Sequence, residues 1–193
     1  MTTIFALILF LFPLAYSPGP GNMFFAANGA RFGWRATIPA NAGYHVATVI
    51  VTFAIGMGLA GLLNANSASF QLLRYAGACY VLWLAWQVGS AGRLGDSAEA
   101  QVAGFWTGVW LLVLNPKAYV IIGLMFSQFL TTGHVGEVAL ISFVFTLNNC
   151  LAFVVWTVLG DGLGRVFRSE QSARSLNMAL GIMLAGVAIW MIV

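Results

Sequence analysis

The stretch YSPGPGNMFF, residues 16–25, places two prolines and two glycines in four consecutive positions of an otherwise apolar segment. Proline removes a backbone donor and clashes with the preceding helical turn, and glycine loosens a helix further. The stretch therefore predicts a break in a helix. In a soluble protein such a break would be an ordinary loop, so its interpretation depends on the class of protein in which it lies.

Composition indicates an integral membrane protein. Of the 193 residues, 61% are hydrophobic and 7% are charged, whereas about a quarter of the residues of a soluble domain are charged. Five acidic and eight basic residues cannot cover the surface of a soluble globule of this size. We expect membrane lipids as partners and no nucleic acid, because the arginines are scattered over several connecting segments.

The N-terminal sequence and the cysteines exclude two other interpretations. MTTIFALILFLFPLAYSPGP contains no early Lys or Arg and continues as an apolar run to Phe25. A cleaved secretory signal has a basic start and a short apolar core, so we expect a retained first membrane helix. Cys79 and Cys150 lie far apart, each inside an apolar run, and we expect them to be buried small hydrophobes rather than disulfide partners.

Apolar segments of the length of a membrane span, about 20 residues, occur six times. We therefore expect an all-α polytopic membrane protein, a single transmembrane domain over residues 1–193. The stretches without Asp, Glu, Lys or Arg are 1–30, 36–73, 75–92, 100–116 with 118–136, 138–160 and 175–193. We expect the second helix at about 37–62, followed by the polar turn NANSAS at 64–69, and the fourth near 103–130. Glycine pairs at 29/33, 104/108 and 160/164 predict close helix contacts.

Arginines predict the orientation of these spans. With six spans, only Arg74 falls on one side, and the other side holds Arg31, Arg35, Arg93, Arg165, Arg168 and Arg174. Basic residues are enriched in cytoplasmic connections. We expect the connections 31–36, 91–102 and 161–174 in the cytoplasm and both termini outside it.

The two halves of the chain resemble each other. A shift of 104 residues aligns the pair Tyr44–His45 with Asn148–Asn149, and it also aligns Gly56 with Gly160, Gly58 with Gly162, Gly77 with Gly181 and Trp86 with Trp190. A slightly different shift aligns LNPKAY (114–119) with SPGPGN (17–22). We expect two three-helix repeats, 1–92 and 101–193, in which helices 1 and 4 are broken at the proline motifs. Three spans is an odd number, so the second repeat is inverted, as in secondary transporters.

The paired breaks predict a binding site. A break leaves carbonyls without partners and exposes N–H groups at the start of the following half-helix. Lipid cannot satisfy them, so the break must line a cavity enclosed by protein, and the positive end of a half-helix suits a carboxylate. Two breaks that converge predict a substrate site at the midplane; a kink that only shapes packing is the alternative.

Several motifs resemble the LysE/RhtB family of amino-acid exporters over the whole chain. They are PGPGN after an apolar helix, YAGACYVLWLAW at 75–86 and LNPKA at 114–118. The stretch at 75–86, together with SLNMALGIMLAGVAIW at 175–190, is closest in appearance to the branch that exports cysteine and O-acetylserine. The resemblance implies a transporter of the bacterial inner membrane that exports amino acids or their derivatives, driven by protons or the membrane potential, without a cofactor.

The resemblance also assigns the two motifs to a transport role. The PGP residues correspond to Pro18, Gly19 and Pro20, and the NPK residues correspond to positions 115–117. Many relatives carry an aspartate in the second helix where this chain has Thr48. Any role of that acid is therefore left open here.

Other polar residues inside the spans complete the predicted site. Lys117 could attract a substrate carboxylate, cap freed carbonyls of the first break, or extend to the membrane surface. His45 could relay protons or only join two helices by a hydrogen bond. Polar residues at helical spacing form stripes on helices 2 and 5. The predicted site is Ser17, Pro18, Gly19, Pro20, Asn22, Asn41, Tyr44, His45, Thr48, Asn115, Pro116, Lys117, Asn148 and Asn149.

The absence of deep acids favours a neutral substrate. Asp161 lies at the expected cytoplasmic end of helix 5, and the other four acids lie in connections. A cationic side chain would lack a counter-ion, which is costly at low dielectric. We expect export of neutral amino acids by alternating access; export of a basic amino acid or a homoserine-type metabolite, metal-ion transport and a membrane scaffold are alternatives. An enzyme is disfavoured because neither HExxH spacing nor paired deep acids occur, and a homodimer is left open.

Overall fold

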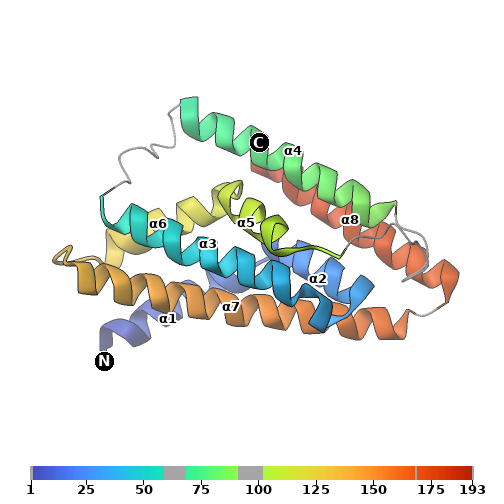
Figure 1. Ribbon diagram of the computed structural model, residues 1–193, viewed down its shortest axis with the longest axis horizontal. Helices are drawn as coiled ribbons and strands as arrows, with labels where there is room; N and C mark the ends of the chain where they lie inside the picture. The colour runs from blue at the N-terminus through green and yellow to red at the C-terminus, as the bar shows by residue number, and fades with distance from the viewer. Residues whose placement is uncertain (1, 59–67, 91–101, 168, 193) are drawn as a thin grey trace.

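The computed structural model describes residues 2–58, 68–90, 102–167 and 169–192, and these residues are helical with short connections. The helices begin where the sequence offers a start, as at Pro20 and Pro116, because proline at the first helical position lacks an N–H that would have no partner there. The elements are α1 (Thr2–Tyr16), α2 (Pro20–Phe32), the 3-10 helix η1 (Trp34–Thr37), α3 (Ile38–Gly56), α4 (Ala68–Gly89), α5 (Phe105–Val113), α6 (Pro116–Phe129), α7 (Val135–Val166) and α8 (Glu170–Ile192) (Figure 1).

Both proline breaks are present. The axes of α1 and α2 differ by 61° across the first break, and those of α5 and α6 differ by 62° across the second. Three further helical stretches are long and apolar enough to cross a membrane alone, namely Trp34–Gly56, Val135–Val166 and Gln171–Ile192. Counting each bent pair as one span, the described residues therefore contain up to five candidate spans. The six-span arrangement is not confirmed, because α4, which contains Arg74 and two glutamines, is not among these candidate spans.

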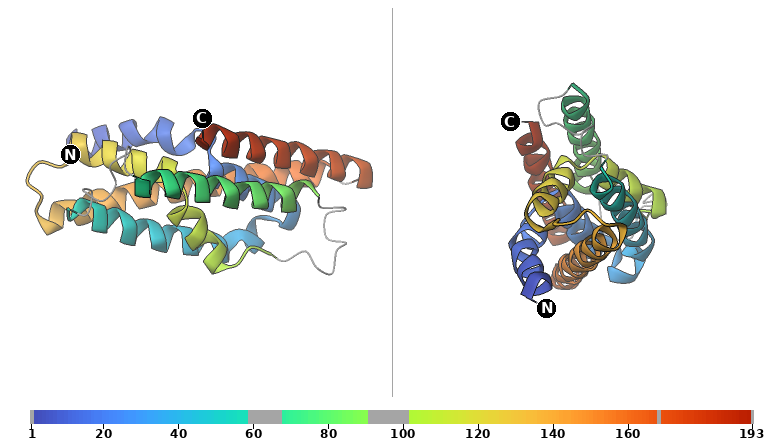
Figure 2. Two further views of the ribbon diagram at one scale, coloured as in Figure 1. Left: turned by 90° about the horizontal axis from the view of Figure 1, so that it is seen from above. Right: turned by 90° about the vertical axis from the view of Figure 1, so that its left-hand side faces the viewer.

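The long helices α3, α4, α7 and α8 run roughly along the long axis of the molecule (Figures 1 and 2). The longest, α7, runs beside α3 in the opposite direction, and α4 and α8 lie side by side along one flank. At one end α2 and α7 finish with Arg31 and Arg165 in their last turns. We call this end, where η1 with Arg35 also lies, the arginine end.

Small residues bring the helices into backbone contact near the arginine end. A Cβ atom added at Gly160 or Gly164 of α7 would overlap the backbone of Ala26 or Ala30 of α2. A Cβ atom added at Gly43 of α3 would likewise overlap the backbone at the start of α5, and one added at Gly108 of α5 would overlap the backbone of α3. The glycine pairs at 160/164 and 104/108 were predicted to allow such contact; Gly104 itself has no neighbour within 4 Å of an added Cβ. We call the contact between α2 and α7 the glycine seam.

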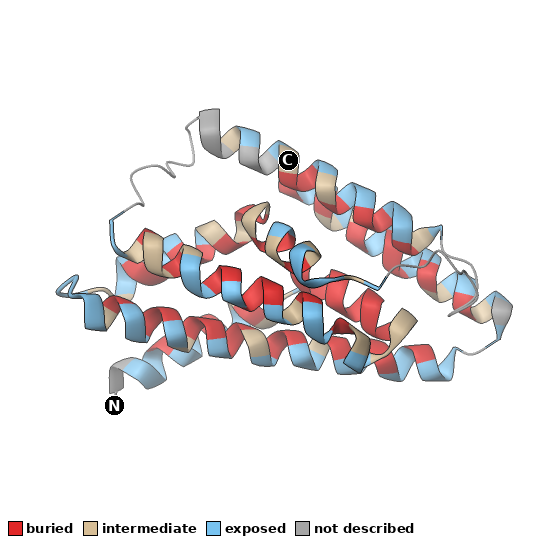
Figure 3. Ribbon diagram, in the orientation of Figure 1, coloured by how far each residue is buried: buried red, intermediate tan, exposed pale blue. Residues whose placement is uncertain are grey.

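The core and the outer surface are both apolar. Buried side chains form two clusters, one centred on Phe25, Leu112 and Phe153 and the other on Leu11, Ile122 and Met125. Many large apolar side chains are exposed, and Figure 3 shows the exposed positions in pale blue along the outward faces of the helices. A surface of this kind suits lipid rather than water.

One expected connection is shorter than predicted. The sequence predicted a connection over 161–174, but α7 continues to Val166 and α8 begins at Glu170. The helix continues because the glycine seam extends to position 164; Asp161 and Arg165 also form an ion pair of 2.7 Å one turn apart. Most of the expected turn at 64–69 and of the connection at 91–102, with Arg93, and Arg168 lie outside the described residues.

Candidate functional site

Each carbonyl of the first break has a donor. The oxygen of Pro13 accepts from the Ser17 backbone at 3.1 Å, and that of Leu14 accepts from the Ser17 hydroxyl at 3.0 Å. Ala15 O accepts from the Asn22 amide at 2.9 Å. The break is therefore stabilised locally by two of the predicted site residues.

Two more distant side chains complete the first break. The indole of Trp156 on α7 donates to Tyr16 O at 3.1 Å. The ammonium of Lys117 donates to Ser17 O at 3.1 Å, to Ser17 Oγ at 2.9 Å and to Pro18 O at 3.3 Å. Of the three roles considered for Lys117, the structure thus shows the capping of freed carbonyls.

Gly19 makes room for this lysine. A Cβ atom added at Gly19 would lie 2.9 Å from Lys117 Nζ and 3.0 Å from its Cδ. Gly19 also precedes α2 in an extended conformation that any residue can adopt. The reason for a glycine here is therefore the close approach of Lys117, and the two proline motifs meet in space through this contact.

The second break is closed mainly by Asn115. Its side-chain oxygen accepts from Lys117 N at 3.1 Å and caps α6. Its amide donates to the Tyr44 hydroxyl at 3.2 Å, which joins the second break to α3. The Tyr119 hydroxyl donates to Val113 O at 2.9 Å. Pro116 occupies the first position of α6, where no donor is needed.

His45 and Asn149 join α3 to α7. The His45 Nδ1 atom lies 2.8 Å from Asn41 O and its Nε2 atom lies 3.3 Å from the Asn149 amide nitrogen. A carbonyl can only accept, so Nδ1 carries the proton and Nε2 accepts from Asn149. The imidazole is therefore neutral in this arrangement, and a proton on Nε2 would require the Asn149 amide to turn its oxygen toward the ring.

A small cavity lies between the two breaks. Its lining includes six of the predicted residues, and its volume of about 20 Å³ holds about one water molecule. Phe153 also lines it. The six are Pro20, Asn22, Tyr44, Asn115, Lys117 and Asn149. Ser17, Pro18 and Gly19 are linked to it through the ammonium of Lys117, so the structure brings nine of the predicted residues together with Lys117 at their centre.

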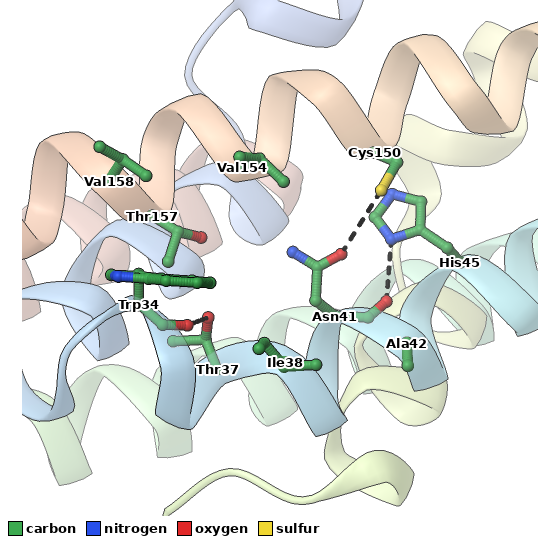
Figure 4. Close-up of a pocket in the computed structure, with 10 residues that line it drawn as sticks. All are labelled: Trp34, Thr37, Ile38, Asn41, Ala42, His45, Cys150, Val154, Thr157 and Val158. Atoms are coloured by element: carbon green, nitrogen blue, oxygen red, sulfur yellow. Dashed lines mark hydrogen bonds between the residues drawn. The ribbon is translucent and has the colours of Figure 1, made fainter.

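Of the other five predicted residues, Pro116 lies at the second break itself, and the remaining four lie outside the small cavity. Asn41 and His45 line a separate, largely apolar cavity of about 310 Å³ between α3 and α7 (Figure 4). Thr48 is fully buried and donates to Tyr44 O at 2.8 Å within its own helix. Asn148 is buried, and its amide nitrogen has no partner among the described residues.

Sequence reasoning missed three aromatic residues of the site. Trp156 and Tyr119 donate to carbonyls of the two breaks, and the Phe153 ring packs on Tyr44 and on His45, with ring centroids 4.6 Å and 5.2 Å apart. Trp156 is one of seven tryptophans and lies in an apolar run. Nothing in its neighbourhood in the sequence distinguishes it from the other six.

Known proteins resemble this chain over almost its whole length. The family described as LysE type translocator matches residues 12–193. The cysteine/O-acetylserine efflux protein of Escherichia coli (strain K12) is 28% identical over 181 residues, which cover 91% of this chain and 90% of that protein. That of Salmonella typhimurium (strain LT2) is 28% identical over 177 residues, with the same shares of the two chains covered. No solved structure matches the chain.

The family match agrees with the broken apolar helices and with the resemblance found in the motifs. LysE-type proteins are translocators, so this chain is a transporter and not an enzyme. Its apolar helices make it a multi-pass membrane protein. On these grounds the chain belongs to the LysE-type translocator family.

Proposed function

We propose that this protein is a secondary transporter that exports neutral amino acids or their derivatives, with the substrate bound between the two breaks. The observation that carries the proposal is that the Lys117 ammonium donates hydrogen bonds to three oxygens of Ser17 and Pro18. An amino-acid substrate carries the same ammonium group. The carbonyl end of a broken helix that holds one ammonium is chemically suited to hold another.

The substrate would exchange places with Lys117. When the lysine withdraws, the α-ammonium of the substrate takes over its acceptors, and the substrate carboxylate pairs with Lys117 Nζ. The first turn of α2 has no side-chain cap, so its N–H groups are available to the same carboxylate. The first turn of α6, by contrast, is capped by Asn115. In the closed protein, the Lys117 ammonium thus occupies the place that the α-ammonium of the substrate would take.

The charge around the site favours a neutral side chain. No acidic residue lines the small cavity in the described part of the chain. Asp161, with 12% of its side chain exposed, is paired with Arg165 at the arginine end. The side chain of a basic amino acid would therefore lack a counter-ion. The names of the two relatives support a substrate resembling cysteine or O-acetylserine; a basic amino acid and a homoserine-type metabolite are the alternatives.

The size of the cavity supports alternating access. A space for about one water molecule is too small for an amino acid, so the protein must open around the site. The equal bends of the two broken helices support two inverted repeats that rock against each other. In such a cycle, the backbone contacts near the arginine end would hold this end together while the rest of the protein opens. The positive-inside rule places the arginine end in the cytoplasm and both termini outside it.

Proteoliposomes loaded with a panel of amino acids test this function. We expect saturable release of O-acetyl-L-serine or of another small neutral amino acid of the panel. Lysine and arginine should leave these vesicles no faster than they leave vesicles without protein. Release is measured with and without an imposed pH gradient. Preferential release of lysine or arginine would contradict the assignment of a neutral substrate, and no release of any member would contradict the proposed function.

His45 could relay protons or only join α3 to α7 by a hydrogen bond, and one substitution separates the two roles. His45→Gln keeps a side-chain amide near Asn41 and Asn149 but cannot take up a proton. We expect the variant to lose the stimulation of release by a pH gradient while keeping release down a substrate gradient. Thr48→Ser, on the same helix, is the control because its hydroxyl is retained. Unchanged stimulation in His45→Gln would assign His45 a structural role only.

A further inference from the structure

A second polar cavity lies at the arginine end, apart from the site between the breaks. It has a volume of about 340 Å³ and is enclosed by the last turns of α2, by α4 and by the residues that start α5. The polar side chains that line it are Asn28 and Arg31 of α2, Gln87 of α4 and Thr107 of α5. Neither proline motif reaches it, so the transport site already described does not account for it.

Arg31 is an incompletely satisfied cation in this cavity. Its Nη1 atom donates to Gln87 O at the long distance of 3.3 Å. Its Nε atom is buried and has no hydrogen-bond partner among the described residues. The guanidinium also lies 4.8 Å from the centroid of the Phe32 ring. A buried donor without a partner is costly, and no acidic side chain from the described ranges lines the cavity. The guanidinium therefore has donors free for an anion.

The other groups of the cavity suit a small polar anion with a short side chain. Asn28 is buried and uses one amide hydrogen on Phe24 O at 2.9 Å, which leaves its other amide hydrogen for a ligand. The helix α5 begins at Phe105, and its N-cap residue Gly104 provides no side-chain cap. Trp83 and Leu84 supply apolar walls. Charge, hydrogen-bond donors and apolar surface thus occur together around one space.

We propose that this cavity binds the carboxylate of the exported amino acid at Arg31, before the amino acid reaches the breaks. The inference rests on the proposed function, and it adds a second subsite on the side from which the substrate comes. The helix α2 connects the two subsites, because its N-terminal turn lines the small cavity and its C-terminal turn carries Arg31. The separation along α2 is about 15 Å, so one amino acid cannot occupy both at once.

Protection of an introduced cysteine tests binding separately from transport. Thr107→Cys is made in the full chain with Cys79 and Cys150 replaced by alanine, and its labelling by a maleimide is timed in proteoliposomes. The Tyr80 hydroxyl donates to the backbone oxygen of Thr107 at 3.4 Å, and the substitution keeps this oxygen, so we expect it to be tolerated. We expect O-acetyl-L-serine to slow labelling and its carboxamide analogue to have no effect. Arg31→Gln should abolish the protection.

Transport kinetics provide the second readout. Arg31→Gln should raise the half-saturating concentration of O-acetyl-L-serine by about tenfold or more, because a charged hydrogen bond is lost, with little change in the maximal rate. Arg35→Gln is the matched control, since Arg35 lies at the same end but packs on the Trp34 ring, at 5.3 Å from its centroid, and does not line the cavity. Equal half-saturating concentrations in the two variants, with no protection of the introduced cysteine, would overturn the inference while leaving the proposed function intact.

A lipid headgroup could supply an anion to the same guanidinium. Labelling is therefore compared in vesicles of phosphatidylcholine alone and in vesicles that also contain phosphatidylglycerol. Slower labelling with phosphatidylglycerol, together with no effect of O-acetyl-L-serine, would assign the cavity to lipid and overturn the inference. If the wild-type protein exports no member of the amino-acid panel, the proposed function itself fails.

Discussion

Replacing Lys117 by methionine should lower the rate of amino-acid export by about 100-fold, which corresponds to about 3 kcal/mol. Methionine keeps most of the length of the side chain but removes the ammonium. Two oxygens of Ser17 and one of Pro18 would lose their donor, and the substrate carboxylate would lose its partner. The rate is measured in proteoliposomes that contain equal amounts of protein.

Two further variants separate the contact from the charge. Lys117→Arg keeps a cation and should retain part of the activity. Gly19→Ala leaves Lys117 unchanged but places a Cβ atom 2.9 Å from its Nζ. The lysine end is flexible and can move away, so we expect the protein to fold and the export rate to fall by about tenfold, as for the loss of one charged hydrogen bond. Wild-type rates in both Lys117→Met and Gly19→Ala would contradict a site at the breaks.

Gly160→Val should destabilise the protein by about 3 kcal/mol or more. The added side chain would overlap the backbone of Ala26 across the glycine seam, and a backbone cannot move aside as a side chain can. To accommodate it, α2 and α7 would have to separate, which would disturb the contact of Trp156 with the first break. The fraction of monodisperse protein that remains after heating in detergent measures the effect.

Gly162→Val is the matched control for this substitution. It lies on the same turn of α7, and an added Cβ there would have no neighbour within 4 Å. Valine is a better helix former than glycine, so the change in helix propensity is the same in both variants and favours the helix by less than about 1 kcal/mol. Equal losses of folded protein in the two variants would show that contact across the glycine seam does not set the stability.

The positions of the breaks could be predicted from the sequence because their causes are local. Pro18, Pro20 and Pro116 each lack a backbone donor, and no partner elsewhere in the fold can restore it. The membrane class could be predicted because composition alone decides whether a chain can cover its surface with charge. The glycines of the seam could be predicted for a similar reason, since GxxxG spacing places two small residues on one face of a helix.

The end of α7 was predicted wrongly because a helix end depends on neighbours. Asp161 was expected to begin a connection, and the sequence offers glycines at 160, 162 and 164 that would normally weaken a helix. Packing against Ala26 and Ala30 favours glycine at two of these positions. Tertiary contact therefore overrides helix propensity here.

Composition and the chemistry of proline act residue by residue, so the order of amino acids was enough to predict apolar membrane helices, two breaks in them and the residue types at each break. The partners of the freed carbonyls, by contrast, became known only from the folded chain. Lys117 and Ser17 are 100 residues apart, and Trp156 and Tyr16 are 140 residues apart. These pairings depend on how each helix is rotated about its axis, and the packing of the whole set of helices fixes that rotation.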